Sequence, residues 1–252
     1  MKFISFSGGV ESTAMCVLYG KGAKAIWCDT GAEHKLMYER IDYVESRLKQ
    51  LHGGDFEIIK VRNEKYISLE KYVVGAHYMP SGQSRYCTRL FKIEPIDDYL
   101  SNIGECELMI GFNFDESDRV GNLGLKPNVK YTYPLLEDGY TRQDCESILH
   151  INNLHPNFPV YMLRGGCRMC FFKSEKEYKA LWYLNRPEFD EMVKFEDAYQ
   201  DNRTKFFSIM PSGKSLRQLA RECSSELFQD ELLEIYENYN KKGKSCGAFC
   251  HR

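Results

Sequence analysis

Cysteines are the residues of this sequence most suited to chemistry. The chain has ten of them among 252 residues, and clustered cysteines in a reducing compartment point to metal or redox chemistry rather than to disulfides. Four form two close pairs, Cys167-x2-Cys170 and Cys246-x3-Cys250. Because two such pairs can supply four thiolates to one tetrahedral centre, they predict a metal site.

The spacing of the two pairs does not select the metal. Four thiolates suit a 4Fe-4S cluster, which we expect first, and they equally suit zinc. Cys87 and Cys145 lie elsewhere in the chain, and either could replace a tail cysteine as a ligand or act as a redox thiol. The remaining cysteines lie in strand or helix patterns and are expected to be small buried side chains: Cys16, Cys28, Cys106 and Cys223.

A glycine loop forms a second candidate site. It lies in the segment S-F-S-G-G-V-E-S-T, residues 5–13, which joins a predicted strand to a predicted helix. Gly8 and Gly9 allow a tight turn that leaves backbone N–H groups uncovered, while nearby hydroxyls and the helix N-terminus add donors, which together suit a phosphate group. Neither the G-x-G-x-x-G nor the G-x-x-x-x-G-K-S spacing is present. These residues alone therefore leave open a plain turn without a ligand.

Alternating strand and helix patterns place this loop in an α/β domain. Apolar and β-branched runs predict strands, and apolar residues at helical spacing predict helices. The alternation is typical of a doubly wound parallel sheet, here of about five strands. A polar stretch over residues 76–85 is expected to be a site or a lid. The predicted strands cover residues 2–7, 24–28, 56–61 and 107–111, and the helices cover 12–19 and 36–51.

Beyond residue 141 the sequence has few strand patterns, and the spacing of its apolar residues predicts helices for the carboxyl half. We therefore expect a nucleotide-binding α/β domain over residues 1–140 and a helical region carrying the cysteine metal site over residues 141–252. The boundary is set by composition alone, because no flexible linker separates the two parts. Helices are predicted over residues 141–152, 174–185, 188–202 and 215–238.

Four motifs resemble those of the PP-loop ATP pyrophosphatase superfamily. The loop resembles S-G-G-x-D-S, with Glu11 where Asp is usual, and residues 29–34, D-T-G-A-E-H, resemble a segment of phosphoadenylylsulfate (PAPS) reductases. Residues 85–96 resemble that family's R-x-C-T-x-x-x-K-x-x-P-I element, and residues 111–119 resemble its G-x-x-x-D-E-S-x-R turn. The chain is most similar to PAPS reductase-like proteins of phages and mobile elements, which are related to the ATP pyrophosphatases of DNA phosphorothioation and tRNA thiolation.

This resemblance implies an adenine nucleotide alpha hydrolase-like fold that binds ATP and Mg²⁺ at the carboxyl ends of the parallel strands. The arginines among the implied ligands suit phosphate or sulfate because of their planar forked donors. It implies catalytic roles for Glu11, Cys87 and Arg119. The residues implied to bind the nucleotide are Ser5, Ser7, Gly8, Gly9, Val10, Glu11, Ser12, Asp29, Thr30, His34, Arg85, Arg89, Lys92 and Gly111.

The resemblance implies one main activity and leaves two alternatives open. The main one is an ATP pyrophosphatase that adenylates a nucleic-acid or nucleotide acceptor for sulfur insertion. One alternative is a thiol-dependent sulfonucleotide reductase that acts on PAPS or its 3′-dephospho form, APS. The other is a non-catalytic nucleotide-binding subunit of a modification or defence complex. All three functions require an adenine nucleotide, and the two enzymatic ones also require a protein that donates sulfur or electrons.

Composition is that of an ordinary globular protein. The chain has 34 Lys and Arg against 36 Asp and Glu, a net charge of −2, which excludes a generally basic nucleic-acid coat. No apolar run approaches the roughly 18 residues of a membrane span, and residues 1–5 read as a strand rather than a signal peptide. We therefore expect a cytoplasmic protein without a membrane partner, and the sequence leaves a homo-oligomer open.

Overall fold

We analysed a computed structural model of the chain. It describes residues 1–119, 126–163, 166–200, 208–210 and 212–224. The predicted tail ligands Cys246 and Cys250 lie outside these residues, as does the predicted helix beyond residue 224. For Arg119 only the backbone is described.

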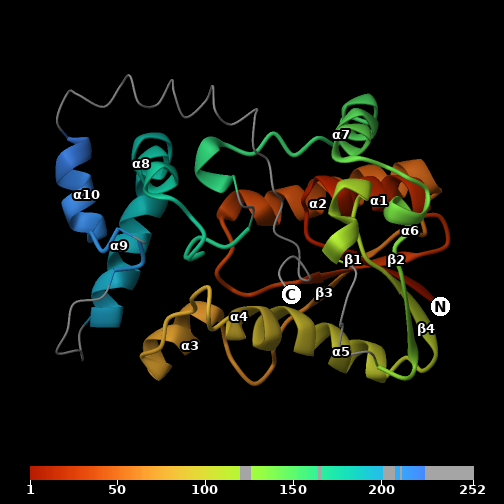
Figure 1. The fold of residues 1–252 in the computed structure, drawn as a ribbon, viewed down its shortest axis with the longest axis horizontal. Helices are drawn as coiled ribbons and strands as arrows, with labels where there is room; N and C mark the ends of the chain where they lie inside the picture. Colours follow the sequence, from red (N-terminus) through yellow and green to blue (C-terminus); the bar gives the residue numbers. More distant parts are fainter. Residues whose placement is uncertain (120–125, 164–165, 201–207, 211, 225–252) are drawn as a thin grey trace.

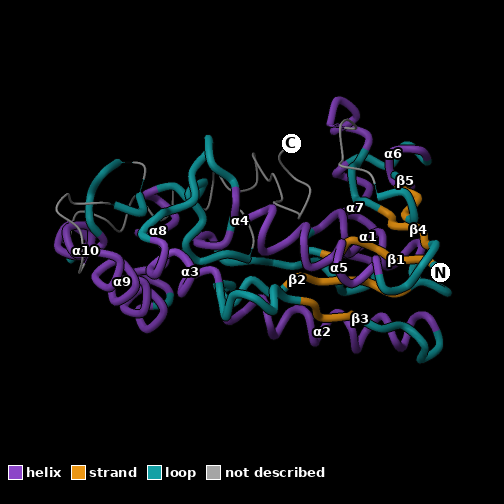
Figure 2. The backbone as a smooth tube through the Cα atoms, turned by 90° about the horizontal axis from the view of Figure 1, so that it is seen from below, coloured by secondary structure: helices purple, strands orange, loops and turns teal. Residues whose placement is uncertain are grey.

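Five parallel strands form one sheet in the order β3-β2-β1-β4-β5, and Figure 2 shows them following one another across the sheet in this order. The chain adds strands on one side of β1 and then crosses to the other side, so the order reverses between β1 and β4. In such sheets ligands bind at the carboxyl ends of the strands, next to this reversal. The strands are β1 (Lys2–Phe6), β2 (Lys24–Cys28), β3 (Ile58–Val61), β4 (Cys106–Met109) and β5 (Val129–Thr132).

Helices cover both faces of the sheet because successive strand side chains point to opposite faces. Ile4 and Phe6 of β1 belong to a core with α1 (Val10–Tyr19) and α2 (Lys35–His52), whereas Phe3 belongs to a second core with α5 (Glu94–Ser101). A further helix, α7 (Arg142–Ile151), packs against α1. This arrangement is a doubly wound α/β fold.

A group of helices stands at the end of the molecule toward which the strands run. Figure 1 shows α8, α9 and α10 together there, with α3 beside them; α8 packs against both α9 and α10, and α3 packs against α9. Their bounds, and those of the connecting turns, are α3 (Leu69–Ala76), α4 (Tyr86–Thr88), η1 (Arg89–Ile93), η2 (Phe114–Arg119), α6 (Pro134–Glu137), η3 (Val160–Met162), α8 (Glu175–Leu184), α9 (Arg186–Gln200) and α10 (Leu216–Cys223).

The predicted doubly wound parallel sheet is confirmed, and each of the four predicted strands and six predicted helices overlaps an observed element. The helices α3 and α5 and the strand β5 were not located from the sequence. Residues 77–85 contain no helix or strand, in agreement with the predicted loop. None of the described helices combines the length and the apolar character that a membrane crossing requires.

Candidate functional site

The glycine loop leaves β1 and turns directly into α1. Gly8 adopts a φ of +76°, and a β-carbon there would lie 2.8 Å from the Met37 Sδ atom of α2, so both the backbone angle and the space require glycine. The Ser7 N–H donates to Ser12 Oγ at 3.1 Å, and the Ser7 and Ser12 hydroxyls are 3.0 Å apart. These bonds close the loop over the first turn of α1.

The carboxyl end of β4 meets the first turn of α1. Gly111 lies against this turn, since a β-carbon there would be 3.5 Å from Ser12 N. Glu11 is 6% exposed, and its Oε1 atom accepts from Arg142 Nη1 at 2.6 Å and from Asn113 Nδ2 at 3.3 Å. Glu11 thus faces the strand reversal, held there by the first residue of α7.

The segment after β2 forms the other wall of the site. Asp29 Oδ1 accepts from the Gly31 N–H and from the Tyr38 hydroxyl, both at 2.8 Å. Thr30 is buried and donates to Glu33 Oε1 at 2.9 Å. The Asp29 carboxylate therefore helps to shape this turn, and Thr30 orients Glu33.

The turn that carries Cys167 and Cys170 (residues 166–170, the cysteine turn) pairs with this segment through a short antiparallel bridge. Glu33 pairs with Cys167, the His34 N–H donates to Gly166 O at 2.7 Å, and the Arg168 N–H donates to Ala32 O at 2.8 Å. A β-carbon at Gly166 would lie 1.7 Å from Glu33 Oε2, so only glycine allows this approach. This pairing carries Cys167 to the carboxyl edge of the sheet.

His34 takes part in this pairing through its backbone, and its fully buried side chain lies in a polar network. Its Nδ1 atom is 3.0 Å from Glu188 Oε1, and its Nε2 atom is 2.6 Å from Lys173 Nζ, which also donates to Tyr161 O at 2.7 Å. Burial and the charge of Lys173 lower the pKa of His34 to about 4. The predicted nucleotide ligand His34 is therefore placed as a neutral residue that joins the β2 segment to α9 and to the chain before α8.

Two adjoining pockets open at this edge. The first, the loop pocket, has a volume of about 360 Å³, and the second, the cysteine pocket, has about 640 Å³, both counted with their open mouths. Lys92 and Gly166 line both. The loop pocket is also lined by Phe6, Ser7, Trp27, Cys28, Glu33 and Ile96, and the cysteine pocket by Thr30, Leu69, Pro80, Arg85, Cys87, Thr88, Cys167, Met169, Cys170, Phe171 and Phe172.

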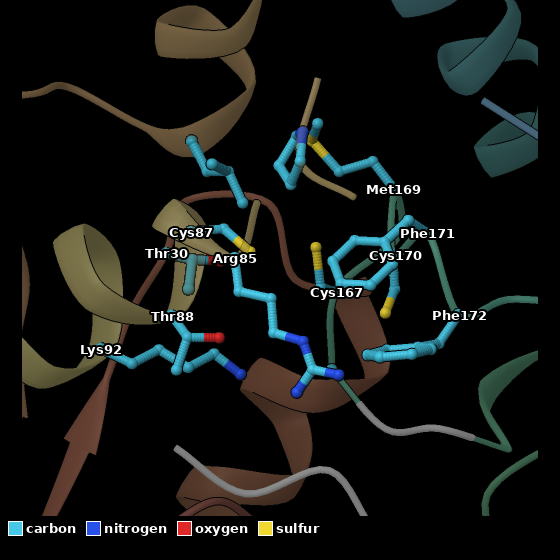
Figure 3. Close-up of a pocket in the computed structure, with 13 residues that line it drawn as sticks. Thr30, Arg85, Cys87, Thr88, Lys92, Cys167, Met169, Cys170, Phe171 and Phe172 are labelled. Carbon is cyan, nitrogen blue, oxygen red and sulfur yellow. The ribbon is translucent and has the colours of Figure 1, made fainter. Parts of the chain in front are cut away.

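Figure 3 shows that the thiols of Cys87 and Cys167 point toward each other within the cysteine pocket, while Cys170 points away from them. Arg85 extends across the pocket, with its Cζ atom 5.0 Å from the centre of the Phe172 ring. Burial, the Glu33 carboxylate and the neighbouring cysteines raise the pKa of the Cys167 thiol well above its ordinary value. Three thiols predicted to do chemistry, two from the C-x2-C pair and one from the 85–96 motif, therefore line one pocket.

Lys92 lies on a π-helical turn, η1, a geometry that often marks functional positions. Arg89 begins the same turn but is exposed, pairs loosely with Glu94 at 3.7 Å and lines neither pocket. Cys145 is fully buried in α7 and is likewise absent from both pocket walls. Of the predicted cations, the structure thus brings Lys92 and Arg85 to the pockets.

The described residues do not by themselves form a metal centre. Among them, no three His, Cys, Asp or Glu side chains lie close enough to hold an ion. The predicted pair Cys246 and Cys250 lies outside the residues described. Three thiols in one pocket have suitable donor chemistry, but their observed arrangement does not fit a metal, so no chemical step is assigned to one.

Sequence reasoning missed several residues of this site. Glu33 and Gly166 stood inside segments already noted, but their contact joins positions 133 residues apart, which no local pattern reveals. Arg40 contacts the glycine loop and is 7% exposed; its place on the apolar stripe of α2, beside Met37 and Ile41, was a usable signal. Lys173 carried no such signal.

Comparison with known proteins agrees with this geometry. Residues 2–126, just under half of the chain, match the family model of the phosphoadenosine phosphosulfate reductase domain, and this amino-terminal part of the chain is PAPS reductase-like. The uncharacterized protein MJ0973 of Methanocaldococcus jannaschii is 26% identical over 178 residues, which cover 66% of this chain. The chain spans about 40% of the length of that curated relative.

A solved structure, the phosphate complex of PAPS reductase from Candida auris, is also similar. Its TM-score is 0.43 with 13% sequence identity, and the match covers 60% of this chain and 72% of the other.

Proposed function

We propose that the protein is an ATP pyrophosphatase that adenylates a nucleic-acid or nucleotide acceptor and so prepares it for sulfur insertion. The observation that carries the proposal is the direct contact between two pockets, one beside the glycine loop and one lined by Cys87, Cys167 and Cys170. Nucleotide activation followed by sulfur transfer requires neighbouring sites, because the activated intermediate must react with sulfur before water hydrolyses it.

The loop is suited to the phosphates of the nucleotide. Its backbone N–H groups and the N-terminus of α1 offer donors to anionic oxygens. Lys92 stands at the boundary between the pockets, where the reacting phosphate would lie, and Arg85 offers a planar guanidinium on the cysteine side. Charge that develops as the phosphate reacts would thus be neutralised by fixed groups, which lowers the barrier.

In the proposed reaction an acceptor oxygen attacks the α-phosphorus of ATP. The new bond joins that oxygen to phosphorus, and the bond to pyrophosphate breaks with its electrons leaving on pyrophosphate. A sulfur nucleophile from a donor protein then displaces AMP from the acceptor. Bound Mg²⁺ would add positive charge at the phosphates, and Glu11 and Asp29 are the predicted carboxylates that could hold it.

The test is turnover of two nucleotides by the full chain with mixed nucleic acid and nucleotides as acceptors. Pyrophosphate release from ATP supports the proposal, and Lys92→Met should lower it by about 100-fold. Arg89→Met is the matched control, because it removes a cation from the same turn that lines neither pocket; its rate should stay within about twofold, the range of an exposed charge.

A sulfonucleotide reductase is the second candidate, favoured by the Cys87 and Cys167 thiols that face each other beside Lys92. Sulfite release from PAPS or APS without ATP cleavage would select it. Tight nucleotide binding without turnover of either nucleotide would select the non-catalytic subunit.

A 4Fe-4S cluster, or zinc, remains a separate proposal that needs ligands beyond the described residues. Anaerobic purification followed by iron, sulfide and zinc analysis tests it directly, with Cys167→Ser as the comparison. Broad visible absorbance with iron and labile sulfide, lost in the variant, would support a cluster. A preparation without metal would leave the pocket cysteines as thiols and favour the reductase.

A further inference from the structure

Arg40 is a buried arginine that has no carboxylate partner among the described residues. It is 7% exposed, and its hydrogen bonds go to neutral oxygens: Gly8 O at 3.0 Å, Thr13 Oγ1 at 3.3 Å and Leu154 O at 2.7 Å. Its Cζ atom also lies 5.8 Å from the centre of the Phe158 ring. Burial lowers the pKa of Arg40 to about 10, which leaves the guanidinium charged at neutral pH. Buried charges are normally paired, so this one needs an explanation.

Two other arginines near the site, Arg142 and Arg168, show the usual arrangement. Arg142 contacts the carboxylates of Glu11 and Glu146, and Arg168 contacts those of Glu70 and Glu191. Both are more exposed than Arg40. The most buried of the three is therefore the one without a carboxylate, and it lies directly behind the glycine loop.

The contacts of Arg40 act on the peptide groups of that loop. The Gly8 carbonyl, which accepts from Arg40 Nε, belongs to the same peptide unit as the Gly9 N–H. In a trans peptide the carbonyl and the N–H point in opposite directions, so the Gly9 N–H faces away from the guanidinium. There it makes a long hydrogen bond to Ser7 Oγ, at 3.4 Å. A hydrogen bond to the carbonyl from a charged donor polarises the unit and strengthens its N–H as a donor.

Thr13 passes the same effect to the next peptide unit. Arg40 Nη2 donates to Thr13 Oγ1, and Thr13 Oγ1 donates to Gly9 O at 2.6 Å. The Gly9 carbonyl shares its peptide unit with the Val10 N–H, the first of α1. Two consecutive loop peptides are thus held and polarised from the α2 side.

We propose that Arg40 is a positioning residue: by bonding to the carbonyl side of the glycine-loop peptides, it makes their N–H groups stronger donors to a bound anion. The bound phosphate, on the other side of these peptides, supplies the negative charge that the buried guanidinium otherwise lacks. The inference rests on the proposed binding of a nucleotide at the loop and assigns to one buried side chain a large part of that affinity. Arg40 touches no ligand itself and acts through Gly8, Gly9 and Thr13.

The test is binding of inorganic pyrophosphate to the full chain, measured by calorimetry at several salt concentrations. Arg40→Met should weaken binding by about 10- to 100-fold, the value of a charge-assisted hydrogen bond, and should flatten the dependence on salt. Arg47→Met is the matched control, since it removes the same charge from the same helix, where Arg47 contacts Gln50 rather than the loop. Its affinity should stay within about twofold of the wild type.

Thr13→Val keeps the side-chain volume and removes only the relay, so it decides the matter if Arg40→Met fails to fold; it should weaken binding by about 3- to 10-fold. A purely structural role for Arg40 would lower the unfolding temperature but leave the affinity of the folded protein and its salt dependence unchanged. Affinities within twofold of wild type in folded Arg40→Met, or in Thr13→Val, would overturn the proposal. Pyrophosphate binding without ATP turnover would count against the proposed function alone, whereas no binding by the wild type would overturn both.

Discussion

The buried His34 network should make the protein sensitive to mild acid. The folded state holds His34 neutral with a pKa of about 4, whereas an unfolded histidine titrates near 6.5. Between these values the unfolded state binds a proton that the folded state does not, so stability falls as the pH falls. From pH 7 to pH 5 the linkage relation gives a loss of about 2 kcal/mol in the free energy of unfolding from this one residue.

Urea unfolding of wild type and His34→Gln at pH 7 and pH 5 measures this contribution. The variant lacks a titrating ring, so its loss between the two pH values should be smaller than that of the wild type by about 2 kcal/mol. His77→Asn is the control, because His77 is an exposed helix C-cap with a φ of +49°, a conformation that Asn accepts. Equal pH losses in wild type and His34→Gln would refute the assignment of His34 as a buried neutral residue.

Three further substitutions test the site's geometry. Gly8→Ala should lower the free energy of unfolding by about 2–4 kcal/mol, from its positive φ and the crowding above α2; an unchanged urea midpoint would contradict it. Gly166→Ala should cost about 1–3 kcal/mol by pushing away Glu33 and should speed alkylation in the cysteine pocket; unchanged alkylation would mean that the turn does not move. Arg142→Gln should cost about 2–4 kcal/mol by leaving the Glu11 carboxylate without a cationic partner, and adding Glu11→Gln should restore part of it; additive losses would show that the two side chains are not coupled.

The centre of the sheet was predictable because β1 and β2 are buried on both faces and therefore form short apolar runs. The long helix α2 was equally clear, since its buried residues recur at helical spacing. Short elements gave weaker patterns. β5 is four residues long with an exposed Lys130, and α3 and α5 have eight residues each, lengths at which packing rather than local preference decides the structure.

The geometry of the glycine loop was predictable because one short segment supplies both its glycines and the hydroxyls that close it. His34 shows the limit of such reasoning. Its motif fixed its position at the end of β2, but the direction of its ring depends on Lys173 and Glu188, which lie 139 and 154 residues further along the chain. Direction is set by packing, so a motif alone could not separate a nucleotide ligand from a buried structural residue.

The same long-range contacts explain why the cysteines reach the carboxyl edge of the sheet at all. Cys87 lies on α4, between β3 and β4, while Cys167 and Cys170 belong to the chain that leads into the helical group. The short pairing of Glu33 with Cys167 brings these two cysteines to the carboxyl edge of the sheet. The buried contact of His34 with Lys173 supports this pairing. Because this pairing also forms a wall of the loop pocket through Glu33 and Gly166, a ligand that moves the segment after β2 must move the cysteine turn with it. Nucleotide binding and thiol reactivity are therefore expected to be coupled, and the rate of Cys167 alkylation with and without ATP would measure that coupling.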